Sequence, residues 1–486
     1  MAEFDLIISG ARVVTGAGEE PRQADIGVSG GRIVAIERDL GQSPATSVCD
    51  ASGLLAFPGV VDAHQHWGIY NDLSQDADSE SRAAAQGGVT TGLTYMRTGQ
   101  YYLNKSGPYA EFFPEVLERT KGHAYTDYAY HLAPMMSKHI EEIPQLIDDF
   151  GVTSFKIFMF YGSHGLHGRS DDQSSFLMIP ADERYNIAHF EFVMRGIQAA
   201  RARRPDLAGR ISLSLHCETP EIMTAYTKLV EEAGELSGLE AYSASRPPHS
   251  EGLAVTIASY LAYETGLPTI NLLHLSSAKA LDAALKMATA FPDVDFRREV
   301  TIGHLVATYE TAGIGGKVNP PLRAQADVDA LWQHVLAGHI SWVASDHACC
   351  KDERKFGNPR DDVFKAYSGF GGTEYLLPGL ITEGRRRGLS LNAMAELVSG
   401  NPAQRFGLTR KGRLVEGFDA DVALVRLDDP WVVHAADSLS TQEYTPFEGM
   451  KMEAKVVHTF LRGHQILTDG TVTGPPLGEY VARGRD

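Results

Sequence analysis

Six residues able to take part in metal or acid–base chemistry stand at or near the ends of short β-like runs. His64 and His66 follow Val60-Val61. Side chains alternate between the two faces of a strand, so both histidines would point the same way and one metal ion could sit between them. The other four are Lys156, His216, His274 and Asp346. Four histidines and a carboxylate suit zinc or a similar divalent ion. Taken singly, each could be a hydrogen-bonded core or turn residue, so the prediction depends on all of them meeting.

Lys156 is the most informative of the six because it lies in an otherwise apolar run, SFKIFMF, at residues 154–160. A buried ammonium group is costly unless it is paired or neutralised, and it would repel a metal. A carbamate formed from its amine and CO₂ reverses the charge and offers two oxygens that can bridge two metals. Burial favours that reaction because it lowers the pKa of the amine. A lysine paired with a buried carboxylate is the alternative.

The elements that must bring these residues together alternate in type over residues 57–405. About eight strand-like runs are separated by helices, among them a long one over 181–203. Such alternation indicates parallel β/α units, and this number predicts a (β/α)₈ barrel with its chemistry at the C-terminal ends of the strands. Residues 1–56 and 406–486 contain mainly short β runs and turns, which predicts a small discontinuous β-sandwich domain built from both chain ends. We expect the tail, residues 474–486, to pack on a neighbouring subunit.

Composition excludes several classes of protein. The chain has 486 residues and a net charge of −18, which excludes nucleic acid as a partner because phosphate binding needs a basic face. Its four scattered cysteines predict a reducing, cytoplasmic setting. We expect no membrane partner, because the N-terminus lacks the features of a signal peptide and no apolar run is long enough to span a bilayer.

The motifs around the six residues resemble those of a known family. PGVVDAHQH, SFKIFMFY, LHCE, LLHLSS and ASDHACC are similar to motifs of the amidohydrolase superfamily, specifically its cyclic amidohydrolases: dihydropyrimidinase/hydantoinase, allantoinase and dihydroorotase. GGVTT, NPPLR, GFGGTEYLLP, NPAQRFGL and KGRLVEGFDADVALV agree, so the resemblance spans nearly the whole chain. It implies a binuclear site with one metal held by His64, His66 and Asp346, the other by His216 and His274, and both bridged by carbamylated Lys156 and a hydroxide. Zinc is the first expectation, with manganese, iron or cobalt as alternatives.

The branch of the superfamily is indicated by a few positions. Dihydroorotases typically carry an arginine where this chain has Gly68, which argues against them. Hydantoinase-type enzymes typically carry a tyrosine five residues after the lysine, and Tyr161 occupies that place. Substrate contacts are expected from Asn319, Trp67, Arg97, His167 and Gly371. The His-, Gly- and Arg-rich segment 162–172 and Arg97 hint at a polar or anionic substrate.

The resemblance implies a reaction as well as a site. A hydroxide held between two cations would attack a ring amide carbonyl, Tyr161 would help to stabilise the oxyanion, and Asp346 would carry a proton to the leaving nitrogen. A small cyclic amide, such as a hydantoin, dihydropyrimidine or related imide, would open, in a homotetramer or homodimer. Hydrolysis of an acyclic amide, carbamate or lactone at the same site stays open. Lys156 argues against a mononuclear deaminase, and the full ligand set argues against a non-catalytic dihydropyrimidinase-related scaffold.

Overall fold

The protein was analysed as a computed structural model that describes residues 3–41, 43–161, 164–168 and 173–484. One of its two sheets contains eight strands, which pair in parallel in the order of the chain. They are β6 (Val60–Gln65), β7 (Val89–Met96), β8 (Asp127–Leu132), β9 (Ser154–Phe158), β10 (Ser212–His216), β11 (Thr269–Leu272), β12 (Asp295–Thr301) and β13 (Trp342–Ala344). The first and last strands meet just beyond their ends, where the His66 N–H donates to the carbonyl of His347 at 2.8 Å. The predicted barrel is confirmed.

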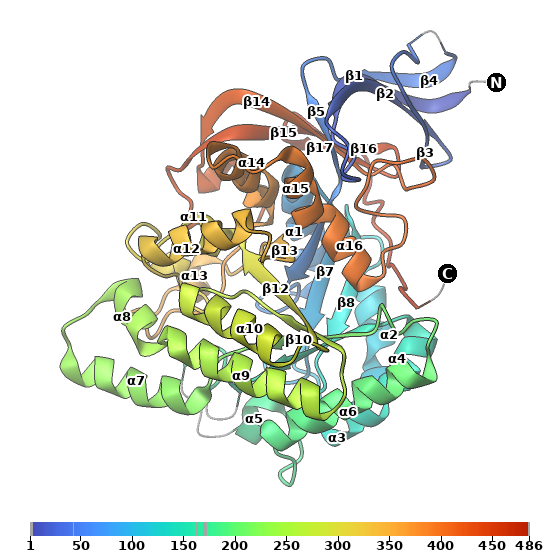
Figure 1. Cartoon of the computed structure of the whole chain (residues 1–486). Coiled ribbons are helices and arrows are strands. Elements are labelled where there is room, and N and C mark those ends of the chain that lie inside the picture. The colour runs from blue at the N-terminus through green and yellow to red at the C-terminus, as the bar shows by residue number, and fades with distance from the viewer. Residues whose placement is uncertain (1–2, 42, 162–163, 169–172, 485–486) are drawn as a thin grey trace.

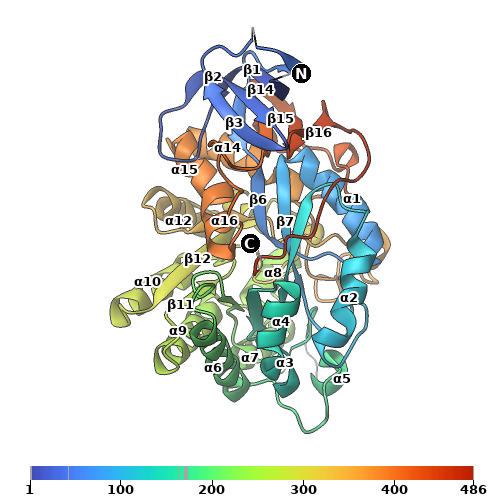
Figure 2. The same cartoon turned by 90° about the vertical axis from the view of Figure 1, so that its right-hand side faces the viewer.

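Helices connect the barrel strands and lie around the barrel (Figures 1 and 2). They are α1 (Leu73–Gln86), α2 (Tyr109–Thr120), α3 (Ser137–Glu141), α4 (Ile143–Phe150), α5 (Gln173–Leu177), α6 (Ile187–Arg203), α7 (Pro220–Ala233), α8 (Gly238–Ser245), α9 (Pro248–Glu264), α10 (Ala278–Ala290), α11 (Ile302–Val306), α12 (Gln325–Leu336), α13 (Asp352–Lys355), α14 (Leu376–Arg386), α15 (Leu391–Ala395) and α16 (Asn401–Phe406). The start predicted at residue 181 for the long helix is wrong. It begins at Ile187, because the Asn186 side chain caps it by accepting from the N–H groups of Ala188 and His189.

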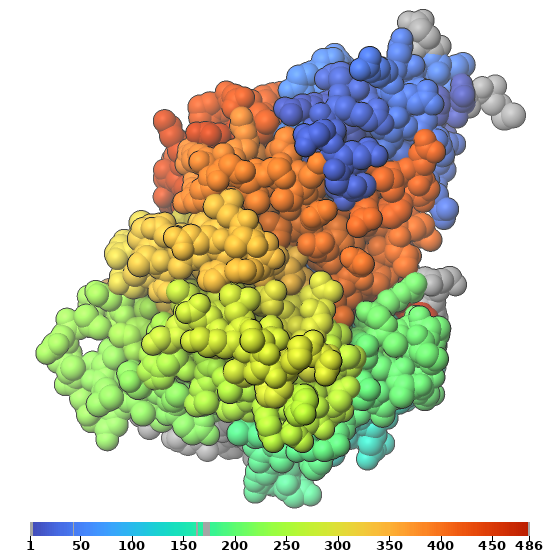
Figure 3. All heavy atoms as spheres, in the orientation of Figure 1, coloured from blue at the N-terminus to red at the C-terminus, as the bar shows by residue number. Residues whose placement is uncertain are grey.

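Both chain ends contribute to the second sheet. It contains β1 (Phe4–Val13), β2 (Arg22–Ser29), β3 (Arg32–Glu37), β4 (Ala45–Asp50), β5 (Leu55–Pro58), β14 (Val422–Val432), β15 (Lys451–Leu461), β16 (His464–Thr468) and β17 (Thr471–Val472). β5 pairs with β1 on one side and with β14 on the other, which joins the two ends. Figure 3 shows the blue N-terminal atoms lying against orange ones from late in the chain. The predicted discontinuous β-domain is confirmed, while its boundaries at 56/57 and 405/406 stay predictions.

A tight link joins this domain to the strand that carries the first two histidines. β5 ends at Pro58, and β6 begins at Val60. Gly59 lies between them, and a Cβ there would lie 2.3 Å from Oγ1 of Thr90, so only glycine fits. The Gly59 N–H donates to the Asp421 carbonyl at 2.8 Å. The β-domain therefore fixes where β6 enters the barrel, and with it the position of the first histidines.

The C-terminal tail packs on its own chain, and its contact with a neighbouring subunit stays a prediction. It descends from the β-domain to the barrel (Figure 2). There the Tyr128 N–H donates to the carbonyl of Glu479, and the Val481 N–H donates to the carbonyl of Tyr128. Arg483 is buried, and its Nη1 donates to Oγ of Ser154 at 2.6 Å. The tail thus satisfies backbone groups of β8 that would otherwise lack partners. No helix in the described part of the chain is long and apolar enough to cross a membrane.

Candidate metal centre and catalytic pocket

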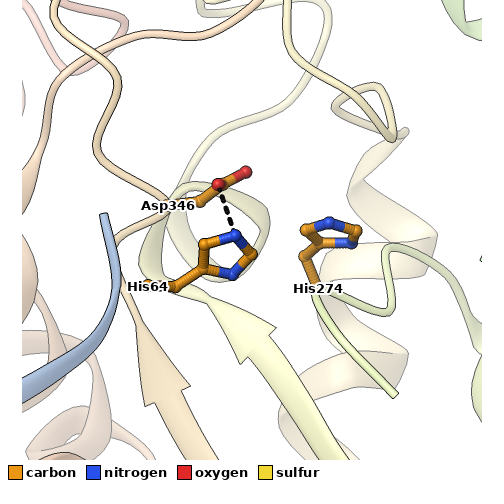
Figure 4. Close-up of side chains that lie close together, drawn as sticks. All are labelled: His64, His274 and Asp346. Carbon is orange, nitrogen blue, oxygen red and sulfur yellow. Dashed lines mark ion pairs between the residues drawn. The ribbon is translucent and has the colours of Figure 1, made fainter. Parts of the chain in front are cut away.

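The six ligand-type residues converge at the C-terminal end of the barrel. His64, His274 and Asp346 offer ligand atoms that all lie within 4.8 Å of one another, and their side chains face one another in Figure 4. Oδ1 of Asp346 is 3.1 Å from Nε2 of His64 and 3.2 Å from Nε2 of His66. The other distances complete the cluster: Lys156 Nζ lies 3.0 Å from His64 Nε2, and the His216 and His274 rings are 4.3 Å apart.

Unusual backbone geometry aims two of these side chains. His274 and Asp346 follow β11 and β13 with φ angles of +32° and +55°, a region that residues other than glycine rarely adopt. Such a conformation costs free energy and persists only where neighbouring groups hold it. The His274 N–H donates to Oε1 of Glu299 at 3.0 Å, and the Ser345 N–H donates to Oδ1 of Asp62 at 3.0 Å. The strand ends are therefore held in a strained form that points ligand atoms at one another, which is typical of functional sites.

Lys156 has the environment that carbamate formation needs. Its side chain is buried, with Nζ 4.1 Å from the Tyr95 ring centroid and 4.3 Å from that of Phe158. Burial lowers the pKa of its amine to about 7, although the negative charges of Asp346 and Glu299 oppose this. Among the described residues, no carboxylate oxygen lies within 4.0 Å of Nζ, so the alternative of a directly paired lysine finds no partner. A substantial share of the amine is thus neutral and nucleophilic at neutral pH.

The donor set fits divalent metal ions. Burial holds the pKa of the His64, His66 and His274 imidazoles below its usual range, so the rings are neutral and offer lone pairs. Nδ1 of His274 is buried and has no hydrogen-bond partner in the described part of the chain. A buried ring nitrogen without a hydrogen-bond partner is costly, and a bound cation would give it one.

Two glutamates orient the ligands, and sequence reasoning did not identify them. Glu299 accepts from His64 Nδ1 at 2.8 Å and from Trp342 Nε1 at 2.8 Å. Glu218 lies 2.6 Å from Nε2 of His216 and forms a buried ion pair with Arg246. Such partners fix the ring orientation and basicity of metal-binding histidines. The signals were a glutamate within a β-like run for Glu299 and the LHCE motif itself for Glu218.

Two of the residues predicted on the substrate side line a pocket beside the cluster. Asn319 and Tyr161 line a pocket of about 440 Å³, including space open to solvent, together with five of the six ligand-type residues. Most of its other lining is apolar or aromatic: Ile69, Tyr70, Tyr102, Phe158, Phe160, Leu166, Val318 and Ala348. Neither Nδ2 nor Oδ1 of Asn319 is idle, because Nδ2 donates to the Leu166 carbonyl at 2.8 Å and Oδ1 accepts from the Tyr242 hydroxyl.

The other four predicted substrate contacts lie outside the lining of this pocket. Trp67 packs near Tyr128 in the barrel wall, and Arg97 lies behind Tyr161. His167 stacks on a neighbouring tyrosine ring, and the Gly371 N–H donates to a glutamine side chain. Their contact with substrate stays a prediction. Residues 162–163 and 169–172 of the His-, Gly- and Arg-rich segment lie outside the described residues.

Comparison with known proteins agrees with this architecture. Residues 261–466 match the model of the amidohydrolase family. An allantoinase from Rubrobacter xylanophilus is 33% identical over 100% of this chain and 99% of its own length. The chain belongs to the amidohydrolase family. Among solved structures, a D-hydantoinase superposes on this amidohydrolase with a TM-score of 0.85 at 25% identity, covering 98% of each chain. An L-hydantoinase (dihydropyrimidinase) from Arthrobacter aurescens superposes with a TM-score of 0.83 at 28% identity over 98% of this chain and 99% of its own.

Members of the amidohydrolase family generally use a binuclear metal site. The cluster in this amidohydrolase offers two groups of histidines, one at the end of β6 and one at the ends of β10 and β11, with Lys156 between them on β9. That layout suits two metal ions bridged through residue 156.

Proposed function

We propose that this amidohydrolase is a metal-dependent hydrolase that opens a cyclic amide, with a five-membered cyclic ureide, the hydantoin ring, as its substrate class. The observation that carries the proposal is the convergence of neutral imidazoles, Asp346 and the low-pKa amine of Lys156 at one end of the barrel, beside a pocket closed in by apolar side chains. The allantoinase and hydantoinase names of the relatives support this ring, because allantoin is a hydantoin that carries a ureido group.

The residues present divide the work of such a reaction. His64, His66 and Asp346 would hold one divalent ion, His216 and His274 the other, and a Lys156 carbamate would join them, with zinc as the first expectation. When bound, the metals would supply an activated water near neutral pH and polarise the substrate carbonyl. The Asp346 carboxylate would accept a proton from the attacking water and pass it to the leaving ring nitrogen. The Tyr161 hydroxyl would donate to the carbonyl oxygen as negative charge develops there.

The pocket lining favours one kind of hydantoin. Side chains such as Ile69, Leu166 and Val318 gain from burying an apolar ring substituent and offer a ureido group no hydrogen bonds. The two polar atoms of Asn319 are already engaged. We therefore place hydantoins with an apolar substituent first. Allantoin is the second candidate, favoured by the allantoinases that are 33% and 30% identical over nearly the whole chain.

A substrate panel tests the proposal. Metal-loaded protein is incubated with 5-benzylhydantoin, 5-isopropylhydantoin, allantoin, dihydrouracil, a cyclic imide, a lactone and an acyclic ureide, and ring opening is followed by loss of absorbance and by mass. The expected order has the apolar hydantoins first, and chelation of the metal should stop all turnover. Protein that binds two metals per chain and opens none of these rings would refute the proposal. Cleavage of only the acyclic ureide or the lactone would redirect it to those classes.

A further inference from the structure

A buried cation lies directly behind the proposed oxyanion donor. Arg97 follows the last residue of β7, and its side chain is fully buried. Among the residues that the structure describes, no carboxylate forms an ion pair with its guanidinium. A buried charge without a counter-ion is unfavourable, so an arginine kept in this state needs a reason other than packing.

Three aromatic rings and one backbone carbonyl stabilise the buried positive charge of Arg97. Its guanidinium carbon lies 5.3 Å from the ring centroid of Tyr102, 5.0 Å from that of Tyr161 and 4.7 Å from that of Phe176. Nη1 donates to the Thr98 carbonyl at 2.9 Å, whereas Nη2 is buried without a partner in the described part of the chain. The electron-rich ring faces attract the cation. An arginine retained only for structure would have all its N–H donors hydrogen-bonded, whereas those of Arg97 are not.

The backbone leaves room for this arrangement. Gly99 has a φ of +105°, and a Cβ at that position would lie 2.8 Å from Nη1 of Arg97. A side chain there would displace the guanidinium. Glycine at position 99 therefore leaves the space that the guanidinium occupies beside the two tyrosines.

The hydrogen bond between Arg97 and Tyr161 can have only one direction, and this direction orients the Tyr161 hydroxyl. Nε of Arg97 lies 3.3 Å from the hydroxyl oxygen of Tyr161. A guanidinium only donates, so the phenol oxygen must accept from it, and the phenol hydrogen turns toward a different acceptor. Tyr161 lines the catalytic pocket together with Lys156 and Asp346, where a substrate carbonyl would lie. The adjacent positive charge also stabilises partial negative charge on the phenol oxygen, which strengthens its O–H as a donor.

We infer that Arg97 is a positioning residue for the reaction: it holds and polarises the Tyr161 hydroxyl so that its hydrogen points at the substrate carbonyl. The inference rests on the proposed function for the identity of the substrate. The role assigned to Arg97 is a physical statement about Tyr161 that can be measured without substrate. Burial raises the pKa of Tyr161, while the charge of Arg97 and, more weakly, that of Arg246 lowers it.

The first test needs no turnover. A fluorinated tyrosine is installed at position 161 of the full-length, metal-loaded protein, and its ionisation is followed by fluorine NMR. Removing the positive charge by Arg97→Met should raise the pKa of residue 161, and Arg97→Lys should leave it closer to that of the parent. Arg405→Lys is the control, since it alters another substantially buried arginine, one that donates to Asn271 and does not line the pocket. An unchanged pKa in Arg97→Met would overturn the inference whatever the substrate proves to be.

The second test uses the hydantoin that the wild-type protein opens fastest. Arg97→Met should lower kcat by about 10- to 100-fold with a smaller change in KM, since a donor aimed at developing charge acts in the transition state. Arg97→Lys should recover part of the loss. In a Tyr161→Phe background the same Arg97→Met change should cost less than about threefold, because coupled residues are not additive. Full multiplicative losses in the double variant would show that Arg97 does not act through Tyr161. A wild-type protein inactive on every ring would count against the proposed function alone.

Discussion

Replacing Lys156 by methionine should make the metal-free protein more stable while removing its chemistry. Methionine is similar in length to lysine, carries no charge and packs well against the Tyr95 and Phe158 rings that surround Nζ. The lysine pKa is about 7 in the folded chain and about 10.4 in an unfolded one. At pH 7 residue 156 is almost fully protonated in the unfolded chain and about half protonated in the folded chain. The unfolded chain therefore binds about half a proton more, and this difference favours the unfolded state.

The size and sign of the effect follow from these two pKa values. Integrating the difference in bound protons gives a destabilisation of wild type on the order of 4 kcal/mol at pH 7, falling to about 2 kcal/mol at pH 9 and to nearly zero above about pH 10.5. A folded-state pKa below the unfolded one means that wild-type stability rises with pH over this window. Lys156→Met lacks this penalty, so its advantage should be greatest at and below pH 7 and should shrink as the pH rises.

The assay is chemical denaturation of chelator-treated protein in CO₂-free buffer at pH 7 and pH 9. Lys355→Met is the matched control, because Lys355 is equally buried with a pKa lowered to about 7, yet its Nζ donates to the carbonyls of Lys317 and Gly369. Those carbonyls would be left unpaired at a cost of about 1–3 kcal/mol each, so little or no gain is expected there. If Lys156→Met unfolds at the same denaturant concentration as wild type at pH 7, or if its advantage does not narrow at pH 9, the account of residue 156 is wrong.

Three further outcomes are expected. Lys156→Ala should lose bound metal and activity, and a short carboxylic acid with added metal should restore part of both; full metal content without the acid would exclude the bridge. Asp346→Asn should keep most metal by elemental analysis yet lose at least about 100-fold in kcat, since it cannot carry the proton; unimpaired turnover would remove Asp346 from the proton relay. Glu218→Gln should weaken metal binding about 10- to 100-fold and destabilise the fold by about 3 kcal/mol, because it leaves Arg246 buried without its carboxylate; metal titration and denaturation at wild-type values would contradict this.

Much of the site could be predicted because its signals are local. Each ligand-type residue lies at or within a few residues of the end of its own strand, and the end of a strand can be read from a few neighbouring residues. Parallel β/α order then brings all such ends to one side of a barrel without knowledge of any long-range contact. His64 and Asp346 are 282 residues apart in the sequence, and His216 lies between them. This rule alone was enough to predict that all three meet.

Partners that depend on tertiary contact could not be predicted in this way. Glu299 contacts His64 across 235 residues of sequence, and no spacing rule links them. The packing of the C-terminal tail is a second tertiary contact that could not be predicted from the sequence. Its Pro-Pro sequence and lack of periodicity suggested a segment with no place on its own barrel, whereas the burial of Arg483 beside Ser154 depends on donors and acceptors that β8 and β9 leave open.

The structure gives His167 and Arg97 contacts within the protein that residue type alone did not predict. The histidine and arginine content of residues 162–172, together with Arg97, indicated a polar or anionic substrate. In the structure, Nδ1 of His167 accepts from the Ser368 N–H at 3.0 Å, and its ring stacks on Tyr367 at 3.9 Å. Burial and the nearby lysines hold the pKa of His167 well below its usual range, so the ring is neutral. The Arg97 guanidinium lies against aromatic rings and donates to the hydroxyl oxygen of Tyr161. The apolar side chains that line the pocket, such as Ile69, Leu166 and Val318, favour an uncharged substituent over an anionic one. Hydantoins with apolar substituents should therefore be opened faster than analogues that carry a carboxylate on the same substituent.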